Sequence, residues 1–214
     1  MSAGVTNWVA GKLVTNLGLA VVGRTPEDFL IVKAKNDSTF LVAVLGVKGV
    51  IDAADVEPLF AGVNKPDFVV NIPSDTLWSG VAIDRIHAAS AAFGTLGDVS
   101  RAANAEDAST FRDKNLGFFI NAMKQHSNVS RVSYVFDAVF RADRKTGKPL
   151  TIAVIDAYNM SAEDVRNART RFGHFDVIVK SSSHGSITNQ ANAAAMTMGA
   201  EALTFGGLMG RLAK

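Results

Sequence analysis

The chain contains no cysteine, and only four of its 214 residues are histidine. The first absence excludes a disulfide framework and a thiolate zinc site, and it agrees with a reducing compartment. The histidines, His87, His126, His174 and His184, follow none of the spacings by which zinc ligands are arranged. A zinc centre is therefore not expected.

Long apolar runs are also missing. No stretch approaches the roughly 18 residues that a membrane-spanning helix needs. The apolar stretch near the N-terminus is interrupted by Lys12 and follows no basic segment. It is interpreted as a helix, not as a signal peptide. We expect a cytoplasmic protein that does not contact a membrane.

Several common enzyme motifs are absent as well. The sequence has neither type of glycine-rich phosphate-binding loop. The segment 181–186 combines serines with His184, but no nucleophile elbow of the form Gly-x-Ser-x-Gly is present, so it is interpreted as a polar loop. What remains is an ordinary globular composition, with 48% hydrophobic and 20% charged residues. The length suits one large domain or two of about 100 residues each.

The chain does contain a repeated pattern. Asp67 and Asp176, 109 positions apart, each open a short apolar run, and an Asp-Val pair precedes each by the same distance. Two further pairs of segments match at an offset of 110: residues 41–46 with 151–156, and residues 92–101 with 202–211. An offset held over four segments predicts a tandem duplication.

The expected organisation is a first repeat at residues 1–102, a small polar linker at 103–110 and a second repeat at 111–214. The two halves differ in charge. Residues 1–107 carry 8 basic and 12 acidic side chains, whereas residues 108–214 carry 14 and 8. If the protein binds an anionic polymer, the second half is expected to form the binding surface. A dipolar surface without function is the alternative.

Each repeat is expected to be α/β, with the order helix, strand, strand, strand, helix, strand, helix. Apolar periodicity and turn residues place these elements in the first repeat at 8–17, 19–22, 29–32, 40–45, 53–61, 68–70 and 82–93. In the second repeat they fall at 116–123, 129–135, 138–141, 150–155, 161–172, 177–179 and 191–203. A hairpin followed by a helix and a further strand implies a mixed sheet flanked by helices.

This order resembles the core of the restriction-endonuclease-like superfamily, the PD-(D/E)xK nucleases. Their signature is an acid at the start of the second strand and Asp/Glu-x-Lys near the end of the third. The resemblance implies two carboxylates that bind Mg²⁺, a metal that activates water at a phosphodiester, and a lysine that offsets negative charge.

Each repeat retains part of the signature. In the first, Asp28 and Lys48 are in place, but Gly46 stands where the second acid belongs. In the second, Asp137 and Asp156 supply both acids, and Tyr158 replaces the lysine. The resemblance therefore implies Asp137 and Asp156 as metal ligands. Neighbouring elements offer substitutes for the missing groups: Asp55 or Glu57 in the first repeat, and Arg166 or Lys180 in the second.

The same residues also have structural interpretations. Asp28 and Asp137 follow turn-like stretches in which Asp commonly bonds its own backbone. Lys48 can be a solvated strand end, and Asp156 can cap the chain into the next loop. Basic side chains of the second repeat are candidates for phosphate contacts or for a solubilising surface: Arg141, Arg144, Lys145, Lys148, Arg166, Arg169, Arg171 and Lys180.

The expected function is that of a nucleic-acid-associated protein of nuclease ancestry, with impaired or lost metal-dependent phosphodiesterase activity. At most it is a weak Mg²⁺-dependent nuclease. The rival expectation is a non-catalytic scaffold or protein-interaction module that keeps the fold. The two repeats suggest a monomeric pseudo-dimer with a pseudo-two-fold axis, or a homodimer of such chains. The arrangement of the basic residues distinguishes the two functions. Basic residues that converge beside Asp137 and Asp156 favour nucleic-acid binding, and scattered ones favour the scaffold.

Overall fold

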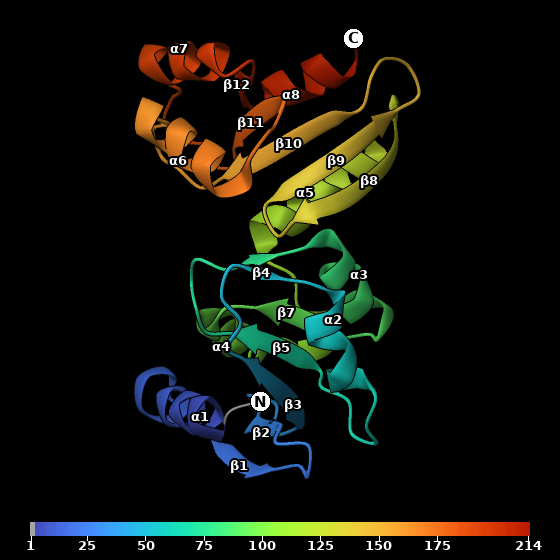
Figure 1. Cartoon of the computed structure of the whole chain (residues 1–214), viewed down its shortest axis with the longest axis vertical. Helices are drawn as coiled ribbons and strands as arrows, with labels where there is room; N and C mark the ends of the chain where they lie inside the picture. Colours follow the sequence, from blue (N-terminus) through green and yellow to red (C-terminus); the bar gives the residue numbers. More distant parts are fainter. Residues whose placement is uncertain (1–2) are drawn as a thin grey trace. The chain divides into compact units, whose positions relative to one another are not determined.

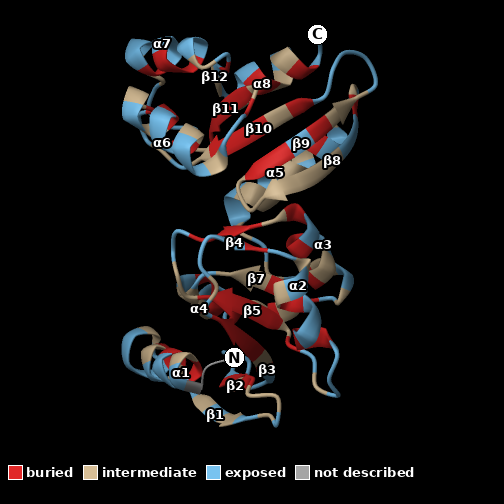
Figure 2. Ribbon diagram, in the orientation of Figure 1, coloured by how far each residue is buried: buried red, intermediate tan, exposed pale blue. Residues whose placement is uncertain are grey.

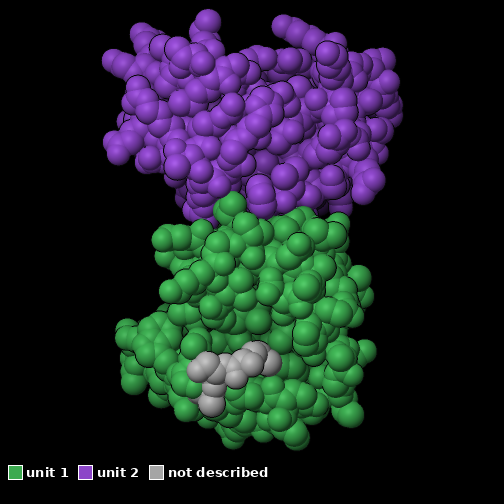
Figure 3. All heavy atoms as spheres, in the orientation of Figure 1, with its two compact units in different colours: residues 1–113 green, residues 114–214 purple. Residues whose placement is uncertain are grey.

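The computed structural model describes residues 3–214, and the chain forms two compact units, Met1–Asp113 and Lys114–Lys214 (Figure 3). Each unit is α/β, with a mixed sheet flanked by helices, as the sequence predicts, and each of these sheets has five strands. Among the described residues, no helix has the length and apolar character needed to cross a membrane.

The first unit is built on the sheet β1-β2-β3-β5-β7 (Figure 1). β1, β2 and β3 pair antiparallel, whereas β3, β5 and β7 pair parallel. Its elements are α1 (Ala3–Leu17), β1 (Val21–Arg24), β2 (Leu30–Lys33), β3 (Thr39–Leu45), β4 (Val50–Ile51), α2 (Ala53–Val56), β5 (Phe68–Asn71), β6 (Leu77–Trp78), α3 (Gly80–Ala88), β7 (Ala92–Gly94) and α4 (Leu96–Ala102). The short strands β4 and β6 form a separate parallel pair.

The second unit has the same strand order, β8-β9-β10-β11-β12, with the same sequence of antiparallel and parallel pairings. Its elements are α5 (Lys114–Gln125), β8 (Val129–Phe136), β9 (Val139–Arg144), β10 (Leu150–Ile155), α6 (Ala162–Phe172), β11 (Val177–Lys180), α7 (Asn189–Thr197), β12 (Glu201–Thr204) and α8 (Phe205–Leu212). A single parallel bridge between Met160 and Ile187 stands where the first unit has β4 and β6.

The main sheet of each unit contains one strand more than the sequence predicts, and each unit has one α-helix more. The first unit also contains the short strands β4 and β6, which the sequence pattern does not predict. The helices expected at 82–93 and 191–203 end at Ala88 and Thr197. Ser90 and Gly199 then take positive φ values of 55° and 71°, which end a helix, and β7 or β12 follows. Strands of only three or four residues leave too short a pattern to be separated from the alanine-rich segments before them.

The residues expected to link the repeats belong to the first unit. Ala103 and Ala108 are buried in its core. The Asn36 side chain donates to the carbonyl of Glu106 at 3.3 Å, and the ring of Phe111 packs on Phe68 with centroids 6.0 Å apart. The boundary between the units therefore lies after Asp113, because apolar side chains of the segment 103–111 pack in the core of the first unit.

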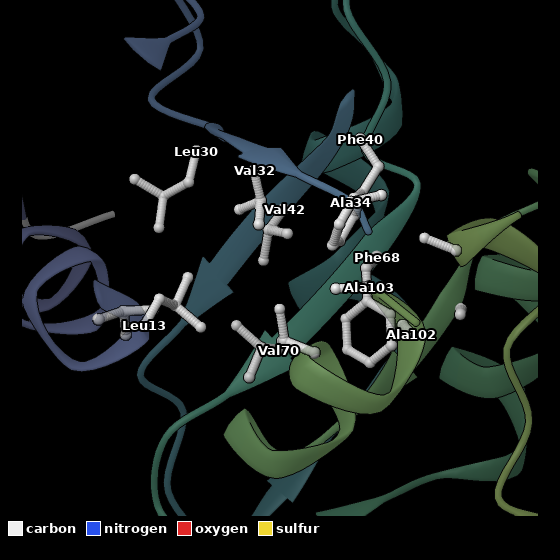
Figure 4. Close-up of a cluster of buried hydrophobic side chains, with 14 of the residues drawn as sticks. Leu13, Leu30, Val32, Ala34, Phe40, Val42, Phe68, Val70, Ala102 and Ala103 are labelled. Atoms are coloured by element: carbon white, nitrogen blue, oxygen red, sulfur yellow. The ribbon is translucent and has the colours of Figure 1, made fainter. Parts of the chain in front are cut away.

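Helices cover both faces of each sheet. In the first unit α1 and α4 share one face, where Leu13, Val42 and Val70 belong to a single buried cluster (Figure 4). The helices α2 and α3 lie on the other side (Figure 1). In the second unit α5 and α8 pack with Ile152 of β10, whereas α6 and α7 pack with its neighbour Ala153. Both faces of the central strands are thus buried (Figure 2), as their continuous apolar runs predict.

The two units repeat individual hydrogen bonds as well as strand order. Asp67 accepts a bond from the backbone N–H of Leu41 at 2.7 Å, and Asp176 accepts one from Thr151 at the same distance. Helix caps recur 109 positions apart, in the pairs Asp52 and Ser161, Ser79 and Thr188, and Thr95 and Thr204. Asp67 and Asp176, on which the recurring sequence pattern was recognised, therefore have structural roles.

Replacing Asp67 or Asp176 by alanine is expected to destabilise the unit that contains it by roughly 1–3 kcal/mol, because a strand N–H loses its acceptor. D67N should destabilise the unit less than D67A, since the amide oxygen of asparagine can still accept the hydrogen bond from the backbone N–H of Leu41.

Burial raises the pKa of the Asp67 carboxyl, so the folded state binds this proton more readily than the unfolded chain. Wild-type stability relative to D67N should consequently fall as the pH rises above about 4. Urea unfolding between pH 3 and 7 tests both statements, and equal pH dependence of the two proteins would contradict the second.

Candidate functional site

A pocket of about 320 Å³ lies in the second unit beside α6. It receives residues from the β8–β9 turn, from the end of β10 and from one side of α6. The residues that line it are Asp137, Ala138, Val154, Ile155, Asp156, Asp164, Asn167, Ala168, Arg171 and Phe172. Both acids that the resemblance singles out in the second repeat therefore border one pocket.

Strand geometry brings these two acids to the same end of the sheet. Phe136 pairs with Val139, so Asp137 and Ala138 form the turn between β8 and β9. Val139 in turn pairs with Ala153 of β10, which ends two residues later at Ile155. Asp156 follows directly, is exposed, and accepts a hydrogen bond from the Ser181 hydroxyl at 3.3 Å.

The third wall of the pocket comes from α6. Asp164, Asn167 and Arg171 are spaced three and four residues apart, which places them on one side of a helix. Asp164 also closes the capping box of α6, where its Oδ2 accepts from the N–H and the hydroxyl of Ser161, both at 2.8 Å. Asp164 and Asn167 are not among the site residues that the sequence predicts, although both border the pocket. Their spacing relative to Arg171 was the available signal.

The pocket offers oxygen ligands of the kind that Mg²⁺ prefers, from Asp137, Asp156 and the Asn167 amide. Within residues 3–214, however, no three acidic or histidine side chains lie close enough together to enclose a metal ion. Mg²⁺ is commonly held by only one or two carboxylates, with water and substrate phosphates completing its shell. The residues thus fit a weak two-carboxylate site and do not fit a closed metal centre.

Tyr158, at the lysine position of the motif, is not among the residues that line the pocket. Its side chain is 69% exposed. The loop that carries it is fixed by its neighbour Asn159, whose side-chain oxygen accepts from the N–H of Ser186 at 2.8 Å. Tyr158 therefore does not supply the pocket with a group that replaces the lysine.

The candidate residues of the first unit are arranged differently. Asp28, with a φ of 68°, accepts bonds from the hydroxyl of Thr6 in α1 at 2.8 Å and from Arg24 at 2.9 Å. Its neighbour Glu27 accepts from the backbone and the side chain of Asn64. These bonds lower the pKa of Glu27 to about 2. Lys48 is exposed after the end of β3.

Strand register explains the difference between the units. Leu30 pairs with Val42, and Phe140 pairs with Ile152. Leu30 and Phe140 are 110 positions apart, so the residue that corresponds to Asp137 is Glu27, not Asp28. Asp28 and Asp137 therefore do not occupy matching positions, contrary to the sequence-based expectation.

The basic residues of the second unit scatter. Arg141 pairs with Asp143 at 2.9 Å. Arg144 donates to the carbonyl of Lys148 inside the β9–β10 turn. Arg169 contacts His174 at 3.2 Å. Lys145, Lys148 and Arg166 are exposed. Of the eight candidates for phosphate contacts, only Arg171 borders the pocket.

Lys180 is withdrawn from the surface. Its side chain is 2% exposed, and its ammonium group donates to the carbonyls of Ser182 and His184, the former at 2.6 Å. A buried ammonium group in this position cannot contact a phosphate backbone unless the loop opens. The apolar β11 sequence before it gave a signal for this burial, because the strand is covered on both faces.

No protein-family model matches the chain, and comparison with curated proteins and with solved structures finds no match either.

Proposed function

We propose that the protein is a nucleic-acid-associated protein of nuclease ancestry whose metal-dependent phosphodiesterase chemistry is impaired or lost. The observation that carries the proposal is the pocket of the second unit, which Asp137, Asp156 and Arg171 border together. Two carboxylates can bind one divalent cation, and a guanidinium group beside them suits a phosphate. The third acid of the pocket, Asp164, is bonded to Ser161 in the cap of α6, and no lysine lines the pocket, which accounts for impaired chemistry.

The proposed ancestry is a duplication of a restriction-endonuclease-like unit, which makes the chain a pseudo-dimer. Three independent features support the duplication: the shared strand order, the matched aspartate bonds and the caps that recur 109 positions apart. The short helix α2, which a 3-10 turn at Glu57–Phe60 continues, replaces the eleven-residue α6. The first unit thereby lost the helix face that forms the pocket wall.

A non-catalytic interaction module is the second candidate, and the scatter of the basic residues favours it. Large apolar side chains are exposed mainly on the first unit, where they include Trp8, Val14, Val22, Val63 and Val81. A protein partner could cover such side chains. The two functions differ in what they require of Asp137 and Asp156, since only the first needs a divalent cation there.

Isothermal titration with Mn²⁺ tests the proposed site. We expect weak binding by the wild-type protein and at least tenfold weaker binding by D137N and by D156N, because each loses an ionised oxygen ligand. D143N is the matched control: it removes a carboxylate that pairs with Arg141 outside the pocket, and it should change the affinity less than twofold. Unchanged Mn²⁺ affinity in D137N and D156N would remove the site.

Nuclease assays with Mg²⁺ or Mn²⁺ are expected to show weak cleavage or none. Robust cleavage that D137A or D156A abolishes would show that the chemistry has not decayed. Robust cleavage that survives both changes would place the activity elsewhere in the chain.

A further inference from the structure

Lys180 is one of five buried polar or charged residues among residues 4–214, and it is the one among them that carries an ammonium group. It ends β11, next to Ile155 in the parallel pairing of β10 and β11. No carboxylate of the described residues lies within ion-pair distance of it. Desolvating a charge is expensive unless polar groups replace water. Here the carbonyls of Ser182 and His184 do so.

The loop that Lys180 holds is bonded to the loop that carries Asp156. Ser181 donates its hydroxyl to Asp156, Ser186 donates its N–H to Asn159, and Met160 donates its N–H to the carbonyl of Ser186 at 2.9 Å. These contacts connect the segments 156–160 and 181–187.

The first unit has a buried polar side chain at the same place. Asn71 ends β5, pairs with Leu45 as Lys180 pairs with Ile155, and lies 109 positions before Lys180. Its amide donates to the carbonyl of Pro73 at 3.3 Å, as Lys180 donates to Ser182. It also exchanges two bonds with the backbone of Val47, in the loop after β3. Both units therefore use this position to hold loops at the carboxyl ends of their parallel strands.

We propose that Lys180 is a positioning residue for the pocket: its buried ammonium group fixes the 181–187 loop, and that loop fixes the segment of Asp156. The pocket's role in metal binding rests on the function proposed above, whereas the loop connection does not. Residues that hydrogen-bond to metal ligands and orient them commonly weaken metal binding by about 10–100-fold when they are removed. Lys180 acts through Ser181 and is not itself a catalytic residue.

Amide hydrogen exchange tests the loop connection. K180M removes the ammonium group and both of its hydrogen bonds while keeping an unbranched side chain of similar length. We expect the amides of Met160 and Ser186 to exchange at least tenfold faster in K180M, because local opening exposes them. The amides of Val154 and Ile178, in the centres of their strands, should stay protected. K180N introduces the residue of the first unit and should restore most of the protection, since an amide can reach the Ser182 carbonyl.

Mn²⁺ titration of the same variants provides the second readout. K180M should bind roughly tenfold more weakly than wild type, and K180N should recover to within about threefold. If Lys180 acted only through its positive charge, removing that charge would strengthen Mn²⁺ binding. A weaker affinity in K180M therefore indicates a positioning role, and a stronger affinity indicates a charge effect. N71A, which loosens the corresponding loops of the first unit, should leave the affinity unchanged.

Unchanged exchange at Met160 and Ser186 in K180M would overturn the inference, as would equal loss of protection in K180M and K180N. Tighter Mn²⁺ binding by K180M would also overturn it. If the wild-type protein binds no Mn²⁺, the proposed function fails, and the exchange measurements alone decide the role of Lys180.

Discussion

Reversing the charge of Arg171 is expected to weaken nucleic-acid binding far more than reversing that of Arg166, although both residues are on α6. Arg171 borders the pocket with Asp137 and Asp156, whereas Arg166 lies about 140° away around the helix and faces solvent. Loss of a charged hydrogen bond costs about 1.5–3 kcal/mol. R171E should therefore reduce affinity at least tenfold at low salt, and R166E less than threefold.

Fluorescence anisotropy with short single- and double-stranded DNA and RNA measures these affinities over a salt titration. Binding should weaken steeply with salt, because phosphate contacts release counterions, and the slope should be smaller for R171E. K33E, which disrupts an ion pair with Asp37 in the acidic first unit, serves as the control outside the basic half. Equal effects of R166E and R171E would indicate a diffuse charge effect without a pocket contact. Absence of binding even at low salt would refute the nucleic-acid proposal and favour the interaction module.

The recurring sequence pattern made most of the α/β architecture predictable from one sequence. Continuous apolar runs such as those of β3 and β10 indicated strands buried on both faces, and the Asp67 and Asp176 pattern located corresponding strands in the two halves. The strands β7 and β12 were not predictable, because they have only three or four residues and follow the alanine-rich stretches 88–91 and 191–200 with no proline or asparagine directly before them as a turn signal. Each is recognisable only once β5 or β11 offers it a partner, which is a tertiary effect.

The pocket was predictable in part. Asp137 and Asp156 could be paired because antiparallel β9 and β10 bring the preceding turn beside the following strand end. The mismatch between Asp28 and Asp137 could not be foreseen, since a shift of one residue between repeats leaves the composition of the turn unchanged. The burial of Lys180 was predictable only in part, because the apolar residues of β11 before it indicate a strand covered on both faces. Its charge suggested a surface, whereas the carbonyls that surround it come from a loop whose path the sequence does not specify.

Replacing Gly185 by alanine is expected to be among the most destabilising single changes in the second unit. Gly185 has a φ of 75°, and a Cβ atom there would lie 1.9 Å from the carbonyl oxygen of Tyr158. Because that oxygen belongs to the backbone, the two loops beside the pocket would have to separate. The alanine would thus disrupt the contacts between Ser186 and Asn159 in addition to straining its own backbone. We expect a loss of roughly 3 kcal/mol or more, in the upper range for point mutations.

Gly199→Ala is the matched control. Gly199 has a φ of 71°, close to that of Gly185, but no atom lies within 4 Å of its Cβ position. Gly199→Ala should therefore lower the free energy of unfolding only by the cost of a left-handed backbone at alanine, about 1–2 kcal/mol. Urea unfolding of both variants separates steric overlap from backbone strain, and failure of G185A to fold would agree with the expected direction. Similar losses in the two proteins would mean that the loops of Tyr158 and Gly185 part easily. In that case the segment of Asp156 is not held rigidly, and Lys180 has no fixed structure through which to position it.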